Sequence, residues 1–159
     1  MQEAANIKKQ LVKHLNGGEA FMALEETLKK IEYKKLGERP QDLPYSFYEL
    51  FYHIWFTQND ILNYCTKREY HAPEWPTDYW PVKRTSENEE EWENLKKHYL
   101  QDRQRLIDLI LSSENALFAP VPSNPQHTIF REMMLAIEHT AYHTGQLLIV
   151  LRHLELHQA

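Results

Sequence analysis

The sequence predicts an all-α fold, and more specifically a four-helix bundle formed by a single domain that spans residues 1–159. Apolar residues recur at three- and four-residue steps in four segments of comparable length, which is the pattern of amphipathic helices. Glycine occurs only four times against many Leu, Glu and Lys residues, and this composition also favours helix. No strand-like alternation and no internal repeat competes with the four segments, so a bundle is the expected architecture.

The first helix is expected over residues 3–35. Apolar residues recur at helical spacing from Ile7 to Leu15, and the pattern resumes from Phe21 to Ile31. The pair Gly17-Gly18 lies between the two halves, where it breaks or bends the helix. The segment GERPQDLPY follows, and its two prolines and one glycine predict a loop.

The second helix has a clear start at Ser46. Glu49 follows three residues later, so the two residues match a capping box, in which each side chain binds a free backbone amide near the other. An apolar face then continues to about Lys67. The segment 69–84, EYHAPEWPTDYWPVKR, contains three prolines and is the longest irregular stretch of the chain.

The third and fourth helices are bounded by similar signals. The segment SENE, which begins at Ser86, matches a second capping box, and the third helix is expected to end near Ser113. Asn124 followed by Pro125 suits the start of the fourth helix, with Asn as the cap and Pro in the first turn. This helix should run to about His153. Its middle is apolar nearly all round, which indicates burial against several neighbours.

Composition and charge exclude several classes of partner. The formal net charge is −5, with acids and bases mixed along the chain, so the concentrated basic face of a nucleic-acid binder is missing. The longest apolar run, residues 147–151, is far shorter than the roughly 20 residues that cross a bilayer. The first ten residues lack the apolar core of a signal peptide. We therefore expect a cytoplasmic protein that binds neither nucleic acid nor membrane.

Three histidines are candidate metal ligands. His139 and His143 are four residues apart, so they lie on one face of the fourth helix and about one turn apart. His53 lies among aromatic and aliphatic residues in the second helix. Each histidine alone also fits a hydrogen-bonded core residue. Three imidazoles in the middle of a bundle are costly to bury without partners, whereas one ion would satisfy all three, and imidazole suits Zn, Ni, Cu or Fe.

Two better-known metal patterns are excluded by spacing. The di-iron bundles require Glu-x-x-His, which occurs nowhere in this sequence, because Glu49 and His53 are one residue too far apart. The zinc-protease signature requires Glu directly after its first histidine. Here Glu138 precedes His139 and Thr140 follows it, so the general base of that mechanism is missing.

The segments that carry these histidines resemble the DinB-like superfamily, also called the YfiT-like metal-dependent hydrolases. The resemblance rests on the histidine in YELFYHIWFTQNDIL, on the His-x-x-x-His-x-Gly-Gln of REMMLAIEHTAYHTGQL, and on the loop EWPTDYWP. It implies an up-down-down-up four-helix bundle, often dimeric, with one divalent metal ion on His53, His139 and His143. Members with known activity are mostly transferases and isomerases that use low-molecular-weight thiols. Relatives commonly have Asp where this chain has Glu138.

Three protein ligands leave coordination positions open, as in catalytic zinc sites. A water there could reach a pKa of about 7 and attack a carbonyl or ester. A thiol there would be deprotonated and become a nucleophile. We therefore expect an enzyme that uses a divalent ion, most simply Zn or Ni, to transfer a thiol to a small molecule or to hydrolyse one. The alternative is a non-catalytic bundle that binds a metal or a ligand.

Several residues near the triad have two interpretations. Gln146, near His143, could form a hydrogen bond with a histidine or pack against a neighbouring helix. Glu49 and Asp60 could orient His53, although exposed salt bridges are the preferred interpretation. Cys65, the single cysteine, excludes an internal disulfide and falls on the apolar stripe, so it is expected to be a core residue. Surface or packing roles are expected for the remaining candidates: His71, His98, His127, His153 and His157.

The proline-rich loop contains an aromatic group, Trp75, Tyr79 and Trp80. These side chains could form a wall of a substrate pocket, but a plug at one end of the bundle is the preferred interpretation.

Aromatic residues around the second helix predict a homodimer. Apolar side chains there surround the whole circumference, although only one stripe can face the core, and large exposed apolar surfaces usually mark interfaces. The alternative is that the 69–84 loop folds back over this surface. The residues concerned are Phe47, Tyr48, Phe51, Tyr52, Ile54, Trp55 and Phe56.

Overall fold

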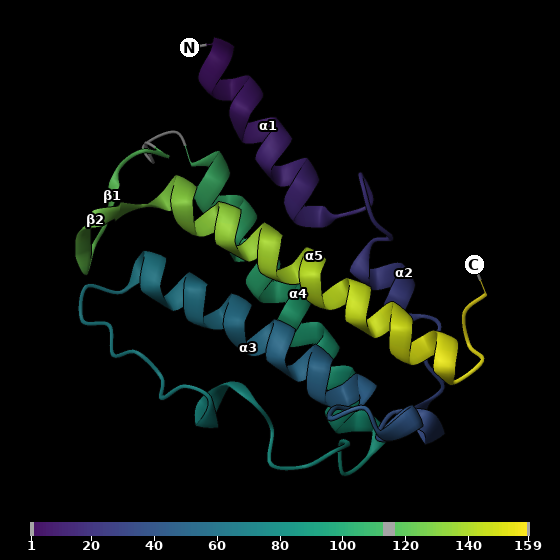
Figure 1. Cartoon of the computed structure of the whole chain (residues 1–159). Helices are drawn as coiled ribbons and strands as arrows, with labels where there is room; N and C mark the ends of the chain where they lie inside the picture. Colours follow the sequence, from purple (N-terminus) through teal and green to yellow (C-terminus); the bar gives the residue numbers. More distant parts are fainter. Residues whose placement is uncertain (1, 113–116, 159) are drawn as a thin grey trace.

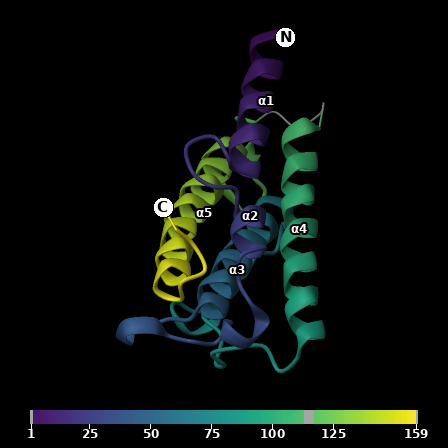
Figure 2. The ribbon, with the colours of Figure 1, turned by 90° about the vertical axis from the view of Figure 1, so that its right-hand side faces the viewer.

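The computed structural model describes residues 2–112 and 117–158, and most of these residues are helical. Four long helices dominate the structure: α1 (Gln2–Asn16), α3 (Phe47–Thr66), α4 (Glu89–Leu111) and α5 (Ile129–His153). The predicted all-α fold is confirmed. Figure 1 shows α5 on one side of the molecule, and Figure 2 shows α4 on the opposite side.

The directions of the helices explain the longest loop. α1 and α5 run one way, whereas α3 and α4 run the other way (Figures 1 and 2). Because α3 and α4 are consecutive and parallel, the chain must travel back along the bundle between them. Residues 67–88 make this return beside α3, with one short 3₁₀ turn at Thr77–Tyr79 (η3). The loop is therefore held against the helix that carries His53.

The predicted break at Gly17-Gly18 is confirmed, but the second half of the first predicted helix, 3–35, is wrong. α1 ends at Asn16, because Gly17 and Gly18 adopt φ angles of 76° and 86°, which glycine tolerates and which end a right-handed helix. A second, short helix follows, α2 (Leu24–Leu28). Two 3₁₀ turns then lead to α3: η1 (Tyr33–Lys35) and η2 (Pro40–Asp42).

The start of α3 is confirmed, whereas that of α4 is wrong. Glu49 N donates to Ser46 Oγ over 3.2 Å and Ser46 N donates to the Glu49 carboxylate over 2.7 Å, which completes the capping box. The cap of α4 is Asn88 rather than Ser86, because the Asn88 side chain itself accepts from Glu91 N at 2.9 Å. α4 ends at Leu111 with Ser112 as its C-cap, within two residues of the predicted end near Ser113.

The predicted start of α5 is also wrong. Residues Asn124–Thr128 form a strand, β2, which pairs antiparallel with β1 (Pro120–Val121). Proline is tolerated in such a short edge strand, so Pro125 fits an extended segment as well as a first helical turn. The α5 helix begins at Ile129, where the Thr128 side chain accepts from Arg131 N at 3.3 Å. The expectation that no strand would form is corrected by this hairpin.

The core consists of apolar side chains between α3, α4 and α5. The Phe51 ring lies 5.2 Å from the Trp92 ring and 5.5 Å from the Tyr99 ring, both in edge-to-face contact. Cys65 is buried among aliphatic residues, as predicted, and burial raises the pKa of its thiol to about 12. Within the described residues, no helix has an apolar stretch sufficient to span a bilayer.

The aromatic surface of α3 that predicted a dimer is covered within the chain. Phe47, Phe51 and Ile54 are buried in the core. The half-buried Phe56 ring lies 5.1 Å from the ring of Tyr79, which belongs to the 67–88 loop. The loop folds back over α3, so this surface does not support an interface with another subunit.

Candidate metal centre

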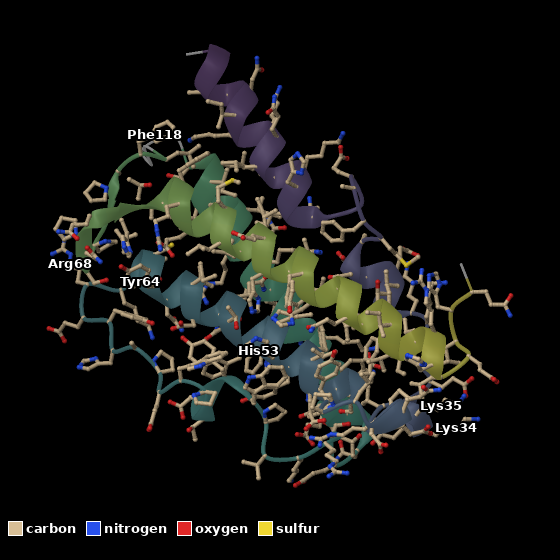
Figure 3. All side chains as sticks on the ribbon, viewed as in Figure 1. Lys34, Lys35, His53, Tyr64, Arg68 and Phe118 are labelled. Carbon is tan, nitrogen blue, oxygen red and sulfur yellow. The ribbon has the colours of Figure 1, made fainter. Side chains whose placement is uncertain are left out.

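The three predicted histidines lie together between α3 and α5. His139 Nε2 is 3.0 Å from His53 Nε2, and one ring nitrogen of each histidine lies within 4.8 Å of the other two. His139 and His143 are one turn apart on α5, and their ring centroids are 4.4 Å apart. Figure 3 labels His53 on α3. His53 and His139 are 86 positions apart in the sequence. The packing of α3 against α5 therefore brings the three imidazoles together.

Two hydrogen bonds orient the rings for a metal ion. His53 Nδ1 is 3.1 Å from the carbonyl oxygen of Tyr79, which can only accept, so Nδ1 carries the proton and Nε2 keeps its lone pair. His143 Nδ1 is 2.6 Å from Gln146 Oε1, which fixes the same tautomer. Metal-bound histidines commonly donate their second nitrogen to a carbonyl in this way. Of the two interpretations of Gln146, the hydrogen bond to a histidine is confirmed.

The charge state of the cluster suits a metal ion. Burial lowers the pKa of His53 to about 4 and that of His139 to about 3, and the neighbouring imidazoles lower the pKa of both further. Burial also lowers the pKa of His143. All three rings are therefore neutral near pH 7, which is the form that binds metal. Zinc–nitrogen distances of about 2.0–2.1 Å place ligand nitrogens about 3–4 Å apart, which the cluster reaches with small movements.

The aromatic residues of the 67–88 loop form a wall of the site. The Trp80 ring stacks on the His53 ring at 4.1 Å with an interplanar angle of 6°. The ring centroids of Trp75 and Tyr79 lie 6.1 Å and 6.4 Å from the centroid of the His53 ring. The predicted plug at the end of the bundle is wrong, because the parallel arrangement of α3 and α4 brings the loop back alongside His53.

Asp60 ties this loop to α3. Its two carboxylate oxygens accept from the hydroxyls of Tyr70 and Tyr79, each at 2.7 Å. Since the Tyr79 carbonyl in turn accepts from His53, Asp60 holds the group that orients a candidate ligand. Burial and the charge of Asp60 raise the pKa of Tyr79 well above its ordinary value. The predicted exposed salt bridge of Asp60 is therefore wrong.

Glu49 does form the predicted salt bridge, although it is buried rather than exposed. Its carboxylate pairs with Arg39, with Arg39 Nε donating over 2.9 Å. Among the described residues, the Glu49 carboxylate is hydrogen-bonded to Arg39 and Ser46 and not to the His53 ring.

One further histidine is more than a surface residue. His127 Nδ1 lies 2.8 Å from the Tyr64 hydroxyl and 3.6 Å from a Glu132 oxygen. The hairpin β1–β2 carries His127 to the end of α3, and the missed hairpin concealed this contact from sequence reasoning.

Fold and site together define a helical bundle with a three-histidine cluster that could hold a metal ion. The sequence model of the DinB superfamily matches residues 18–147, which include all three histidines. The chain therefore belongs to the DinB superfamily. No curated protein and no solved structure matches the sequence significantly.

Proposed function

We propose that the protein is a metal-dependent enzyme that acts on a small molecule, with His53, His139 and His143 as ligands of a divalent ion such as Zn or Ni. The observation that carries the proposal is the donor set. Within residues 2–112 and 117–158, the cluster has three nitrogen donors and no fourth histidine, cysteine or carboxylate. A structural zinc site is normally closed by four protein ligands, whereas a catalytic site keeps a position open for water or substrate.

Transfer of a low-molecular-weight thiol is the reaction that this site supports best. An ion held by three imidazoles lowers the pKa of a bound thiol or water, so that either becomes a nucleophile near neutral pH. Hydrolysis also benefits from a general base, and among the described residues no carboxylate is hydrogen-bonded to the three rings. Thiol transfer needs no such base, because the thiolate is itself the nucleophile. Hydrolysis remains the second reaction, and a non-catalytic metal-binding bundle is the alternative to an enzyme.

The residues of this chain have separate roles in the proposed reaction. Tyr79 and Gln146 hold the His53 and His143 rings in the tautomer that binds metal. Trp80 covers one face of His53 and keeps water from it. These roles need no movement of the helices, so we expect the site to be assembled before any ligand binds.

Metal analysis followed by an activity screen tests the proposal. Protein purified without a histidine tag is reconstituted with Zn or Ni, and about one equivalent of metal should remain bound after desalting. His139→Ala should lose that metal, whereas His153→Ala, an exposed histidine on the same helix, should retain it. Loaded protein is then assayed with cysteine or glutathione against 1-chloro-2,4-dinitrobenzene, and with p-nitrophenyl esters. Tight metal binding without either activity would favour the non-catalytic alternative.

We also propose that the protein forms a homodimer, through α5 rather than α3. Tyr142 and Ile149 lie seven residues apart on the outer face of α5 and are 65% and 43% exposed. Gly145 lies between them, and a Cβ added there would meet nothing within 4 Å. Figure 1 shows no other element in front of α5.

Size makes this face complementary to a second copy. If two α5 helices pack antiparallel about a twofold axis between residues 142 and 145, Tyr142 lies over the partner's Gly145. Sedimentation should show a dimer that Tyr142→Glu dissociates. Leu100→Glu, an equally drastic change at an exposed leucine on α4, should leave the dimer intact. A monomer at micromolar concentration would contradict the proposal.

A further inference from the structure

A groove of about 320 Å³ runs between α3 and α5 and reaches His139 at one end. Arg131, Leu135 and His139 line it at four-residue steps on one face of α5. Along the helix axis the eight residues from Arg131 to His139 span about 12 Å. On α3 the groove extends from Thr57, one turn beyond His53, to Tyr64 near the end of the helix (Figure 3). The groove is therefore elongated, with the histidine cluster at one end only.

The walls of the groove are largely aromatic and aliphatic. Ile61 and Leu135 face each other across it from α3 and α5. The Tyr64 and Tyr70 rings form another wall, with centroids 4.9 Å apart and an interplanar angle of 66°. An apolar cavity of about 150 Å³ is enough for one benzene molecule. The groove thus has room for a ligand with two aromatic rings or an equivalent apolar body.

The charged residues along the groove are already paired. Both oxygens of Asp60 accept from tyrosine hydroxyls, and Arg131 Nη1 donates to Glu132 at 2.5 Å. Glu132 is buried, so its charge is held close to the guanidinium. A charged ligand would have to separate one of these pairs, or its own charge would stay without a partner. Either outcome costs free energy. The groove therefore favours an uncharged body.

Hydrogen-bonding groups gather at the end far from the cluster. The Tyr64 hydroxyl and His127 Nδ1 are 2.8 Å apart beside Arg131. A guanidinium has five N–H groups, so Arg131 can donate to a further acceptor while it binds Glu132. Nearer the cluster, the Thr57 hydroxyl is buried without a hydrogen-bond partner in the part of the chain that the structure describes. A ligand that accepts a hydrogen bond would satisfy groups that are otherwise incompletely paired.

We propose that this groove binds an elongated, uncharged small molecule with an aromatic or similar apolar body. Its reacting group lies at His139, and its far end presents a hydrogen-bond acceptor to Tyr64 and Arg131. The proposal rests on the proposed function for the position of the reacting group, and it names the class of electrophile that this site would take. It does not concern the thiol.

Hydroxamates test the two ends of the groove separately, because the hydroxamate group binds divalent ions while the rest of the molecule can be varied. Zinc-loaded protein is titrated by calorimetry with acetohydroxamate and with biphenyl-4-hydroxamate. We expect the biphenyl compound to bind about 100-fold more tightly, because its rings leave water for the groove. Thr57→Phe should remove most of this gain and leave acetohydroxamate binding unchanged. Thr66→Phe, at an exposed threonine on the same helix, is the matched control.

The far end is tested with two derivatives of the biphenyl compound. A 4′-carboxamide should bind about tenfold more tightly than a 4′-aminomethyl group, because the amide oxygen accepts from Arg131 and Tyr64 whereas an ammonium is repelled by Arg131. Arg131→Leu should reduce this preference to less than about threefold. A preference for the ammonium compound would overturn the assignment of the far end.

Failure of the groove and failure of the metal site give different results. If acetohydroxamate binds but the rings add less than about threefold in affinity, the groove proposal is overturned and the metal site stands. If neither hydroxamate binds, the proposed function fails. The groove is then tested with biphenyl-4-carboxamide, which needs no metal, by following the Ile61 and Leu135 methyl resonances by NMR. Shifts that Thr57→Phe abolishes support the groove on their own, and unchanged spectra overturn it.

Discussion

Removal of the Asp60 carboxylate should weaken metal binding although its hydrogen bonds go to tyrosines rather than to a candidate ligand. Asp60 accepts from the Tyr70 and Tyr79 hydroxyls at 2.7 Å each, and the Tyr79 carbonyl accepts from His53 Nδ1 at 3.1 Å. Asp60→Ala leaves both tyrosine hydroxyls without their acceptor and frees the loop at two points. His53 then loses the fixed carbonyl that holds its tautomer and ring plane.

The expected magnitude follows from comparable metal sites. Loss of a group that orients a metal ligand costs about 10- to 100-fold in affinity, or about 1.4 to 2.7 kcal/mol. Asp60→Ala should lie in the upper part of this range, because it releases two tyrosines. Tyr70→Phe removes one of the two hydrogen bonds but leaves Tyr79 anchored, so its effect should be about threefold or less. The ranking of these two variants is specific to the loop geometry.

Competition with a chromophoric zinc chelator measures these affinities. Nitrogen NMR of the histidine rings in metal-free protein provides a second measurement, because it reports directly which ring nitrogen of His53 carries the proton. In Asp60→Ala the His53 signal should move toward an average of the two tautomers. If Asp60→Ala bound zinc within twofold of the unmodified protein and kept the His53 tautomer, the argument that the loop orients this ligand would be refuted.

Three further predictions concern single contacts. Gln146→Leu removes the 2.6 Å hydrogen bond to His143 and should lower zinc affinity about tenfold in the same competition assay, with Gln104→Leu on the exposed face of α4 as a neutral control. Cys65 should resist iodoacetamide at about pH 8 in folded protein and react fully in denaturant, because burial raises the pKa of its thiol to about 12; rapid labelling of folded protein would contradict the core assignment. Burial raises the pKa of Glu49, but hydrogen bonds from Arg39 and Ser46 outweigh this effect and hold the pKa below its ordinary value of 4.5. The Arg39–Glu49 pair therefore stabilises the fold above pH 4.5, and this stabilisation is lost as the pH falls through the lowered pKa. Arg39→Gln should therefore cost about 1–3 kcal/mol in the free energy of unfolding at neutral pH, and the difference should shrink in acid.

The features that sequence predicted correctly are local. The capping box at Ser46 and the pair His139 and His143 each depend on residues within one turn of helix, so spacing alone defines their geometry. The addition of His53 required a chemical argument, namely that one metal ion would satisfy three buried imidazoles that are otherwise costly to bury. The structure brings the three rings together, in agreement with that argument.

The wrong predictions concern residues whose local preferences allow two outcomes. Two glycines can bend a helix or end it, and here the positive φ angles of Gly17 and Gly18 end α1. Pro125 is compatible with the first turn of a helix and with an edge strand, so only pairing with residues 120–121 decides between them. In both cases the outcome depends on a backbone conformation or on pairing with a nearby strand, and no periodicity reports either.

The links around the site were missed for a related reason, since they depend on the path of the 67–88 loop. Asp60 reaches Tyr79 across 19 residues, and His53 reaches the carbonyl of Tyr79 across 26. Prolines predicted that the segment is irregular but gave no direction. The direction follows from topology, because parallel α3 and α4 can be joined only by a segment that travels back along the bundle.

This topology divides the site into two parts that can change separately. The ligand nitrogens depend on the packing of α3 against α5, and their orientation depends on the loop through Asp60 and Tyr79. The far end of the groove depends instead on the hairpin, which brings His127 to Tyr64. Changes at Tyr64 should therefore alter which small molecules bind while zinc affinity stays unchanged, whereas changes at Asp60 should alter both. A Tyr64→Phe variant that lost zinc as readily as Asp60→Ala would show that the two parts are coupled, and the separation argued from the topology would fail.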